Sequence, residues 1–226
     1  GHSGKINAVC WSPNGNWIAT GGSDASLRIW DAKSYEVIAV LDDLQADVQS
    51  LAWSPDGRHL AMGLGKPNSS PFGNGPVTLD RGIQILDLTE PSMPKVSRAL
   101  TGHRSVLAVA WNATSDQLAT AGINAQSDNG RIRIWDVTNG TEVNAMTMPT
   151  EIVFALQWTP DGTTIISGSS GPQFRGQIAF RSVEDGTIRK TFEGQQQVLS
   201  IALNRDATRV LSTGSDRTVK LWDTNS

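Results

Sequence analysis

Apolar and polar residues alternate over short stretches of this chain, and the same arrangement returns five times. Each unit has an apolar segment, a polar turn, a second apolar segment ending in small residues, and a third segment with apolar residues at alternate positions. A period of two is typical of half-buried strands. The third segments are LRIWD (27–31), IQILD (83–87), IRIWD (132–136), IAFRS (178–182) and VKLWD (219–223). The pattern therefore predicts an all-β array of short strands.

The length of the repeat specifies the architecture. One aligned position of the first segment is occupied by Trp11, Trp53, Trp111, Trp158 and Leu203. The steps between these residues are 42, 58, 47 and 45 residues. The shortest step matches the roughly 40–45 residues of a four-stranded propeller blade, so the longer steps contain inserted loops. A unit of this size cannot bury its apolar face alone and must stack on its neighbours.

Three short motifs recur in order along these units. They are Gly-His at 1–2 and 102–103, Pro-Asp-Gly at 55–57 and 160–162, and Trp-Asp at 30–31, 135–136 and 222–223. With these motifs the chain resembles the WD-repeat family. The resemblance implies one β-propeller array over residues 1–226, with five consecutive four-stranded blades. The expected blades cover about 1–43, 44–101, 102–148, 149–194 and 195–226.

The last blade is expected to be incomplete, because no sequence remains for its fourth strand. Members of the family typically have seven blades, which need about 300 residues at this period. We therefore expect an open fragment of a larger propeller, and the absence of an initiator Met before Gly1 points the same way. A five-bladed closed ring and self-association through open blade edges are the alternatives.

The resemblance also implies a structural tetrad in each blade. In the family, a His before the first strand bonds a Ser or Thr of the second, which reaches an Asp in the next turn, with the Trp of the third strand at the end. The complete set here is in blade one: His2, Thr20, Asp24 and Trp30. Blade three keeps His103, Thr120 and Trp135, and blade five keeps Ser212, Asp216 and Trp222 with Gln195 in place of His. Leu86 and Arg181 replace the Trp in blades two and four.

A repeated His-Ser/Thr-Asp set argues against a catalytic triad, which occurs once and at a cleft. We expect no catalytic, metal-binding or cofactor-binding residues. The three histidines are dispersed, and the Gly-rich segments do not lie between a strand and a helix as a phosphate loop would. Cys10, the single cysteine, is expected to be a small core residue beside Trp11, and the other strand tryptophans are expected to pack against neighbouring blades.

Composition limits the partners. The formal net charge is −3, which gives no electrostatic footprint for nucleic acid. No apolar stretch is long enough to span a bilayer, and no signal peptide is present, so we expect no membrane association and a cytoplasmic location. The expected partner is a protein or peptide.

Long loops indicate where that partner would bind. In a blade, the loops that join the second and third strands share one face with the connections between blades. The insertions 66–81, 124–130 and 171–176 all extend this face in blades two to four. Binding residues concentrate in such loops, and aromatic and Arg side chains are favoured anchors, which selects Phe72, Phe174 and Arg175. Trp17, aligned with mostly polar residues, is a further candidate on the opposite face and is expected to face solvent.

These observations favour a non-catalytic protein-interaction scaffold. An alternative is the sensor region of a larger signalling protein, such as an ATPase or kinase. A catalytic propeller with hydrolase activity is the weaker alternative, because no convergent polar cluster is evident in the sequence.

Overall fold

The structure is a computed structural model that describes residues 1–44, 46–65, 82–124, 130–148 and 150–225. Strands dominate these residues, and the one helical segment among them is the short 3₁₀ helix η1 (Pro172–Phe174). No helix in the described ranges is long and apolar enough to cross a membrane. Phe72 and the insertions 66–81 and 125–129 lie outside the described residues.

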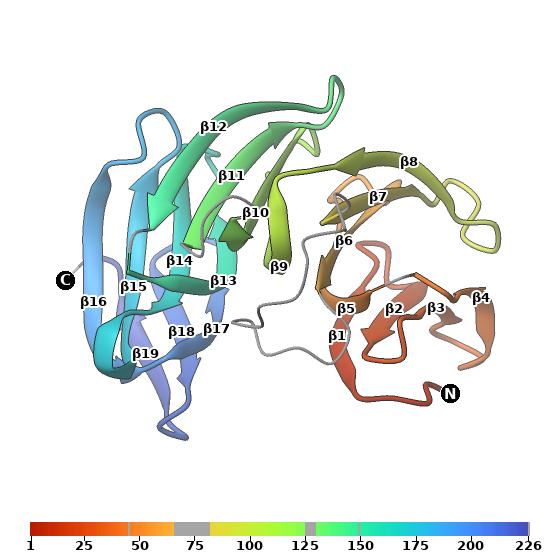
Figure 1. Cartoon of the computed structure of the whole chain (residues 1–226), viewed down its shortest axis with the longest axis horizontal. Coiled ribbons are helices and arrows are strands. Elements are labelled where there is room, and N and C mark those ends of the chain that lie inside the picture. Colours follow the sequence, from red (N-terminus) through yellow and green to blue (C-terminus); the bar gives the residue numbers. More distant parts are fainter. Residues whose placement is uncertain (45, 66–81, 125–129, 149, 226) are drawn as a thin grey trace. The chain divides into compact units, whose positions relative to one another are not determined.

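The strands form five sheets, and within each sheet the strands follow the order of the sequence (Figure 1). Blade one contains β1 (Ile6–Trp11), β2 (Trp17–Gly22), β3 (Leu27–Asp31) and β4 (Val37–Leu41). Blade two contains β5 (Asp47–Trp53), β6 (His59–Gly65), β7 (Ile83–Asp87) and β8 (Lys95–Leu100). Blade three contains β9 (His103–Trp111), β10 (Gln117–Asn124), β11 (Gly130–Asp136) and β12 (Thr141–Met148).

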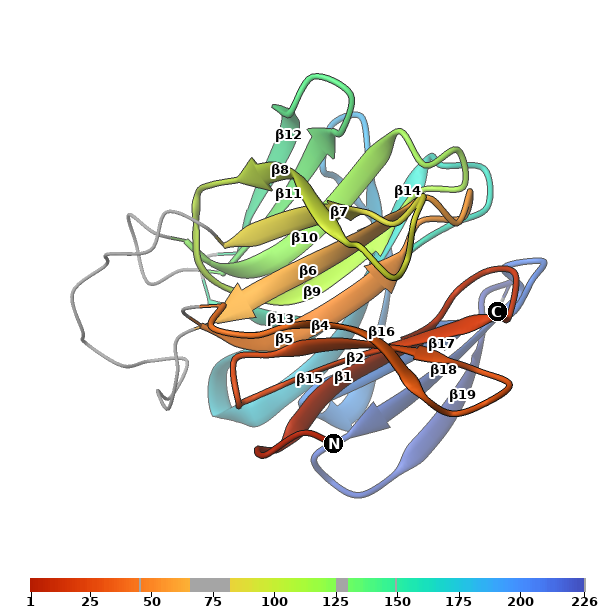
Figure 2. The ribbon, with the colours of Figure 1, turned by 90° about the vertical axis from the view of Figure 1, so that its right-hand side faces the viewer.

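Blade four contains β13 (Ile152–Trp158), β14 (Thr164–Ser170), β15 (Arg175–Ser182) and β16 (Ile188–Gln196). Blade five has three strands, β17 (Val198–Leu203), β18 (Arg209–Gly214) and β19 (Val219–Asp223), which lie side by side in Figure 2. The predicted four-stranded sheets and the incomplete fifth sheet are thus confirmed. The aligned third-strand residues fall on equivalent strands: Trp30 on β3, Leu86 on β7, Trp135 on β11, Arg181 on β15 and Trp222 on β19.

The tight turns follow from the Gly-containing sequences. In Thr159–Gly162, for example, Gly162 adopts a φ of +69° and donates its N–H to the Thr159 carbonyl at 2.9 Å. The Asp161 carboxylate accepts the Thr163 backbone N–H at 3.1 Å, and this hydrogen bond further stabilises the turn. Because most L-residues avoid positive φ, glycine at this position specifies the turn between β13 and β14.

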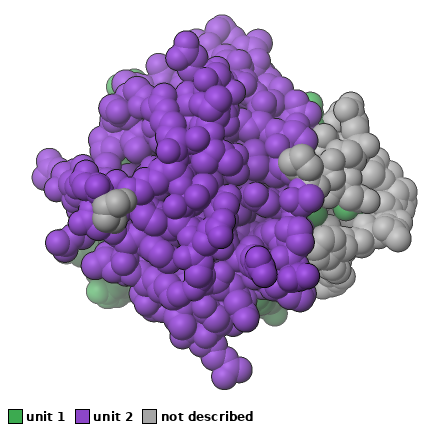
Figure 3. Space-filling view, turned by 90° about the vertical axis from the view of Figure 1, so that its left-hand side faces the viewer, with its two compact units in different colours: residues 1–109, 123–128 green, residues 110–122, 129–226 purple. Residues whose placement is uncertain are grey.

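The chain divides into two compact units, residues 1–109 with 123–128 and residues 110–122 with 129–226, which are coloured separately in Figure 3. The first unit has a core between blades one and two, where Leu27 and Ile29 pack with Val48. The second unit has a core between blades four and five, where Ile178 and Phe180 pack with Val198. The single array over 1–226 stays a prediction.

One face of blade one is exposed and does not belong to these cores. Trp11 on β1 is 59% exposed, so the expectation that it packs against a neighbouring blade is wrong. The opposite face of the same sheet carries Ala19 and Ile29, which are fully buried against blade two. Because successive strand residues point to opposite faces, blade one buries one face and leaves the Trp11 face exposed.

Candidate functional site

The tetrad of blade one forms a continuous hydrogen-bonded chain. Trp30 Nε1 donates to Thr20 Oγ1 at 2.8 Å, and Thr20 Oγ1 lies 2.8 Å from His2 Nε2. His2 Nδ1 lies 3.0 Å from both carboxylate oxygens of Asp24. The order differs from the expected one, because His2 stands between Thr20 and Asp24. The imidazole has two ring nitrogens and so bridges Thr20 and Asp24.

Sequence reasoning missed Ser26, which completes this network. Its hydroxyl donates to Asp24 Oδ1 at 2.8 Å and lies 3.1 Å from His2 Nδ1. Burial disfavours ionisation of Asp24, but the hydrogen bonds from His2 and Ser26 outweigh it and hold the pKa of this carboxyl well below its usual range. The carboxylate therefore fastens the segment before β1 to the turn between β2 and β3.

Blades two, three and five show how far the tetrad can vary. Blade five keeps the series of hydrogen bonds, with Gln195 in place of the His. Trp222 Nε1 donates to Ser212 Oγ at 2.8 Å, and Ser212 Oγ donates to Gln195 Oε1 at 2.6 Å. In blade three, Trp135 Nε1 donates to Thr120 Oγ1 at 2.9 Å. In blade two, Met62 and Leu86 occupy the Thr and Trp positions, and both are fully buried, so apolar packing replaces the polar network.

Blade four carries an ion pair at the equivalent place. Arg181 replaces the Trp and is buried, with Nε 3.4 Å from Ser167 Oγ and Nη2 3.5 Å from Glu151 Oε2. Glu151 Oε2 also accepts the Ser169 hydroxyl at 3.0 Å. Burial lowers the pKa of Arg181, while the negative charge of Glu151 opposes that shift. Glu151 of this pair also lines a pocket on the same blade.

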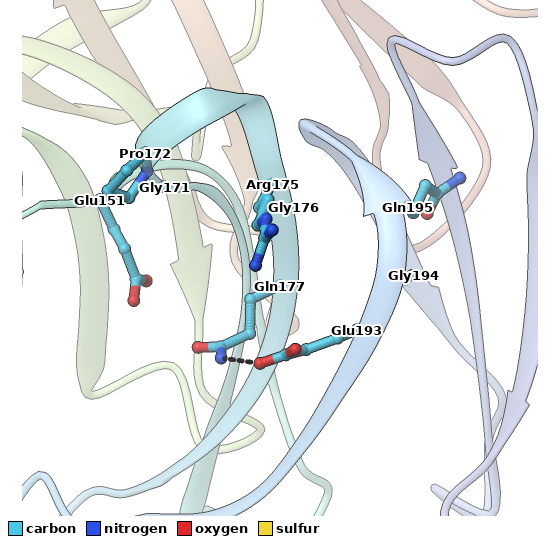
Figure 4. A pocket seen from close by; sticks show the side chains of 9 residues that line it. All are labelled: Glu151, Gly171, Pro172, Arg175, Gly176, Gln177, Glu193, Gly194 and Gln195. Carbon is cyan, nitrogen blue, oxygen red and sulfur yellow. Dashed lines mark hydrogen bonds between the residues drawn. The ribbon is translucent and has the colours of Figure 1, made fainter.

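That pocket has a volume of about 410 Å³ and opens beside η1 (Figure 4). Its charged and amide lining consists of Glu151, Arg175, Gln177, Glu193 and Gln195, and glycines supply much of the rest. Glu151 directly precedes β13, Arg175 and Gln177 lie at the start of β15, and Glu193 and Gln195 lie at the end of β16. The pocket therefore belongs to the set of loops that the sequence selected, although Glu151, Gln177 and Glu193 were not among the predicted residues.

The predicted contact residues have different surroundings. Phe174 and Arg175 are both exposed, and Phe174 is 64% accessible at the end of η1. Phe174 has a φ of +60° and the preceding Gln173 has a φ of +57°, in the left-handed region. The Phe174 carbonyl accepts the Gln197 backbone N–H at 3.1 Å, which joins this loop to the connection before β17. The backbone thus holds an apolar ring out from the surface of blade four.

Trp17 was expected to face solvent, but the structure places it partly inside the protein. It is half-buried and stacks on Trp53 of blade two, with ring centroids 6.2 Å apart and planes 16° from parallel. The large indole reaches the next blade from a position where shorter polar side chains would stay at the surface. Cys10 is also half-buried against this core, and burial raises the pKa of its thiol to about 12, opposite to the shift a nucleophilic cysteine needs.

The described residues contain no group of three or more His, Cys, Asp or Glu side chains arranged to hold a metal ion. The expectation that no residue is catalytic or binds a cofactor stays a prediction. What the described part of blade four offers is a surface: one exposed aromatic ring, one exposed guanidinium and a polar pocket next to them.

A family profile described as "WD domain, G-beta repeat" matches residues 1–31, 94–136, 140–175 and 182–223. The longest interval without a match, 32–93, includes most of blade two, where apolar residues occupy the tetrad positions. Curated relatives include Protein FIZZY-RELATED 3 of Arabidopsis thaliana, 27% identical over 184 residues, and Serine-threonine kinase receptor-associated protein of Gallus gallus, 25% identical over 228 residues. Guanine nucleotide-binding protein subunit beta-1 of Caenorhabditis briggsae is 26% identical over 170 residues.

These matches cover 81%, 100% and 75% of this chain, in the same order. They cover 35%, 57% and 44% of the relatives. The chain thus spans between about a third and somewhat more than half the length of the curated relatives it matches.

Proposed function

Because the chain belongs to the WD-repeat family, we propose that it is a non-catalytic scaffold that binds a protein or peptide. The binding surface is the face that carries the insertions 66–81, 124–130 and 171–176 of blades two to four, and the insertion described in full is that of blade four. The observation that carries this proposal is Phe174, a 64% exposed aromatic ring held out by a left-handed backbone next to a pocket.

Energetic reasoning supports this surface. Two successive residues with positive φ cost free energy, and such strain persists at places where a particular geometry is used. Exposed aromatic and Arg side chains are the residue types that most often dominate binding energy at interfaces. Phe174 and Arg175 are adjacent, so one partner segment can contact both.

The names of two relatives fit the same role. One is a receptor-associated protein and another is a subunit of a guanine nucleotide-binding protein, and both descriptions refer to association with other proteins. The identity of the partner of the present chain is a separate question, which a capture experiment addresses directly.

The test compares two exposed aromatic residues. Proteins captured from a lysate by the wild-type chain are identified, and the binding of one captured protein is measured for Phe174→Ala and for Tyr35→Ala. Tyr35 is the matched control, since it is 76% exposed, has a φ of +60°, and lies in the turn between β3 and β4, which belongs to the opposite set of loops.

Phe174→Ala should weaken binding by more than about 1 kcal/mol if the ring is an anchor, and Tyr35→Ala should leave binding unchanged. Loss of binding with Tyr35→Ala but not with Phe174→Ala would move the site to the other face and contradict the proposal. Both variants must unfold at the wild-type denaturant midpoint, so that a change in binding is not a change in folding.

We also propose self-association, on a different observation. The exposed face of blade five carries Leu211, Val219 and Leu221, and that of blade one carries Val9 and Trp11. Leu211 and Leu221 are direct cross-strand neighbours. Exposed apolar patches of this kind mark surfaces that associate.

The edges of the sheets add less than the sequence suggested. β1 is an edge strand, but the first strand is an edge in each of the five sheets, so the edge of β1 is not special to blade one. In the described residues β19 is hydrogen-bonded to β18 alone, and the last strand of each other sheet likewise has a single neighbour. The exposed faces therefore carry the proposal of self-association.

A further inference from the structure

We infer that the pocket of blade four binds the basic side chain of a partner, Arg or Lys, through a set of hydrogen-bond acceptors. This inference rests on the proposed function, because it assigns the chemistry of a partner to the same face. The pocket volume of about 410 Å³ lies near the lower end of the roughly 300–1,000 Å³ of ligand pockets, which suits one side chain rather than a folded element.

The first observation is an acceptor without a donor. Gln177 Oε1 is buried and makes no hydrogen bond to any described residue. The other end of the same amide is committed, since Gln177 Nε2 donates to Glu193 Oε1 at 3.2 Å. A buried acceptor that has lost water and gained no partner costs free energy, so an N–H group entering the pocket would remove that cost.

The second observation is the carboxylate on each side of this amide. Figure 4 shows Gln177 between Glu151 and Glu193, with its bond to Glu193 dashed. Both polar contacts of Glu151 described above use Oε2. The Glu193 contact uses Oε1. One oxygen of each carboxylate is therefore available to an incoming donor.

The side-chain amide donors of the pocket already make hydrogen bonds within the protein. Gln195 Nε2 donates to the Thr218 carbonyl and hydroxyl, both at 3.0 Å, and Gln195 Oε1 accepts from Ser212. The remaining side-chain donor group is the exposed guanidinium of Arg175, which carries five N–H groups. The two carboxylates and the one guanidinium of the lining sum to a formal charge of −1, so a ligand with several N–H groups and a positive charge fits better than a carboxylate or a phosphate.

Gly176 allows a close approach of the two strands that line the pocket. A Cβ atom on Gly176 would lie 2.8 Å from the Gln195 carbonyl oxygen and 2.9 Å from the backbone nitrogen of Gln197. Only glycine permits this approach of β15 to the end of β16, where the register shifts between Gly176 and Gln177. The shift lies at the point where Gln177 enters the pocket lining.

The probe is N-acetyl-arginine amide, and its neutral isostere, N-acetyl-citrulline amide, is the matched ligand. Binding to the full chain is followed by titration, with the side-chain amide signal of Gln177 in a nitrogen-15 spectrum as the local readout. The arginine compound should shift this signal and bind at least about tenfold more tightly than citrulline, because a charged donor to a carboxylate is the stronger contact. Equal binding of both compounds, or no binding of either, would overturn the inference.

Two variants and a control assign the binding to the pocket. Glu193→Gln should weaken the arginine compound about two- to fivefold, the range for an exposed charge pair, and more at low ionic strength. Glu184→Gln makes the same change on an exposed residue of the β15–β16 turn, away from the pocket, and should have no effect. Arg175→Ala removes a like charge and should strengthen binding.

If Arg175→Ala abolishes binding of the arginine compound while Glu193→Gln does not, the carboxylates do not bind its guanidinium and the inference is wrong. These measurements use a small probe, so their outcome is separate from that of the capture experiment. Binding of the arginine compound together with a partner that ignores Phe174→Ala would retain the pocket and refute the proposed face. Partner binding that depends on Phe174, with no binding of the arginine compound, would retain the proposed face and refute the inference about the pocket.

Discussion

Gly21 on β2 faces Val48 on β5 so closely that a Cβ atom on Gly21 would lie 2.2 Å from Val48 Cγ1. The same relationship recurs one blade later, where a Cβ on Gly63 would lie 2.7 Å from Val106 Cγ1, and between Gly168 and Val198, also at 2.7 Å. In each case the glycine follows the second-strand position of the tetrad and the valine belongs to the first strand of the next blade. At these three junctions, a valine therefore packs into the space that the absent side chain of a glycine leaves.

Gly21→Ala should lower the free energy of unfolding by about 1–3 kcal/mol, because the added methyl group overpacks the contact between blades one and two. Chemical denaturation measures the change. The double variant Gly21→Ala with Val48→Ala should be less destabilised than the sum of the two single variants, since removing the valine methyl groups makes room. Strict additivity would show that this contact does not limit the packing of the two blades.

Asp24→Ala should destabilise the chain by about 1–3 kcal/mol, because His2 and Ser26 lose a buried partner. Asp42→Ala is the control, since Asp42 is an exposed residue just beyond β4. The captured partner should bind the folded Asp24→Ala protein as tightly as the wild type. Weaker binding at unchanged stability would give Asp24 a role in recognition.

Acid should weaken the same network. The pKa of Asp24 is lowered in the folded state, so the ionised carboxylate is favoured by folding. Its contribution to stability is complete above the unfolded pKa of about 4 and is lost as the pH falls through the lower folded value. Asp24→Asn should therefore reduce the difference between the denaturation midpoints at pH 6 and pH 3. An unchanged difference would exclude Asp24 as a source of the acid sensitivity.

Glu151→Gln alone should cost about 2–4 kcal/mol, because the buried Arg181 guanidinium loses its counter-charge. Glu151→Gln combined with Arg181→Met should recover most of this loss, as no buried charge remains. Denaturation of the two single variants and the double variant gives the coupling free energy. A coupling near zero would mean that Ser167 and Ser169 alone satisfy these side chains.

The sequence predicted the strands well because their signal is local. Alternation and the Trp-Asp motif located β3, β11 and β19, and the aligned Leu86 and Arg181 fell on the equivalent strands of blades two and four. The exposure of Trp11 could not be predicted from the sequence, because β1 has the same alternation of apolar and polar residues as strands that are buried. Burial of a sheet face depends on what lies against it, and that is not a property of the strand.

The pocket was harder to predict for a related reason. Glu151, Gln177 and Glu193 are polar residues at strand ends, far apart in the sequence, and nothing in their local pattern separates them from ordinary surface residues. One signal was available: Arg181 at a Trp position needs a counter-charge, and Glu151 precedes the first strand of that blade, near the place of the tetrad His. Trp17 shows the converse error, because an alignment with polar residues does not reveal that an indole can reach Trp53.

Leu221→Lys should reduce self-association, because it places a charge in the middle of the exposed apolar face of blade five, where Leu221 is 61% exposed. Burying that charge against another copy would require its desolvation, whereas the monomer leaves it in water. Val143→Lys is the matched control, since Val143 on β12 is an isolated valine with 51% exposure. Sedimentation velocity over a hundredfold range of concentration should show association of the wild type and of Val143→Lys, and a larger monomer fraction for Leu221→Lys. A wild-type chain that stays monomeric throughout would refute self-association through this face.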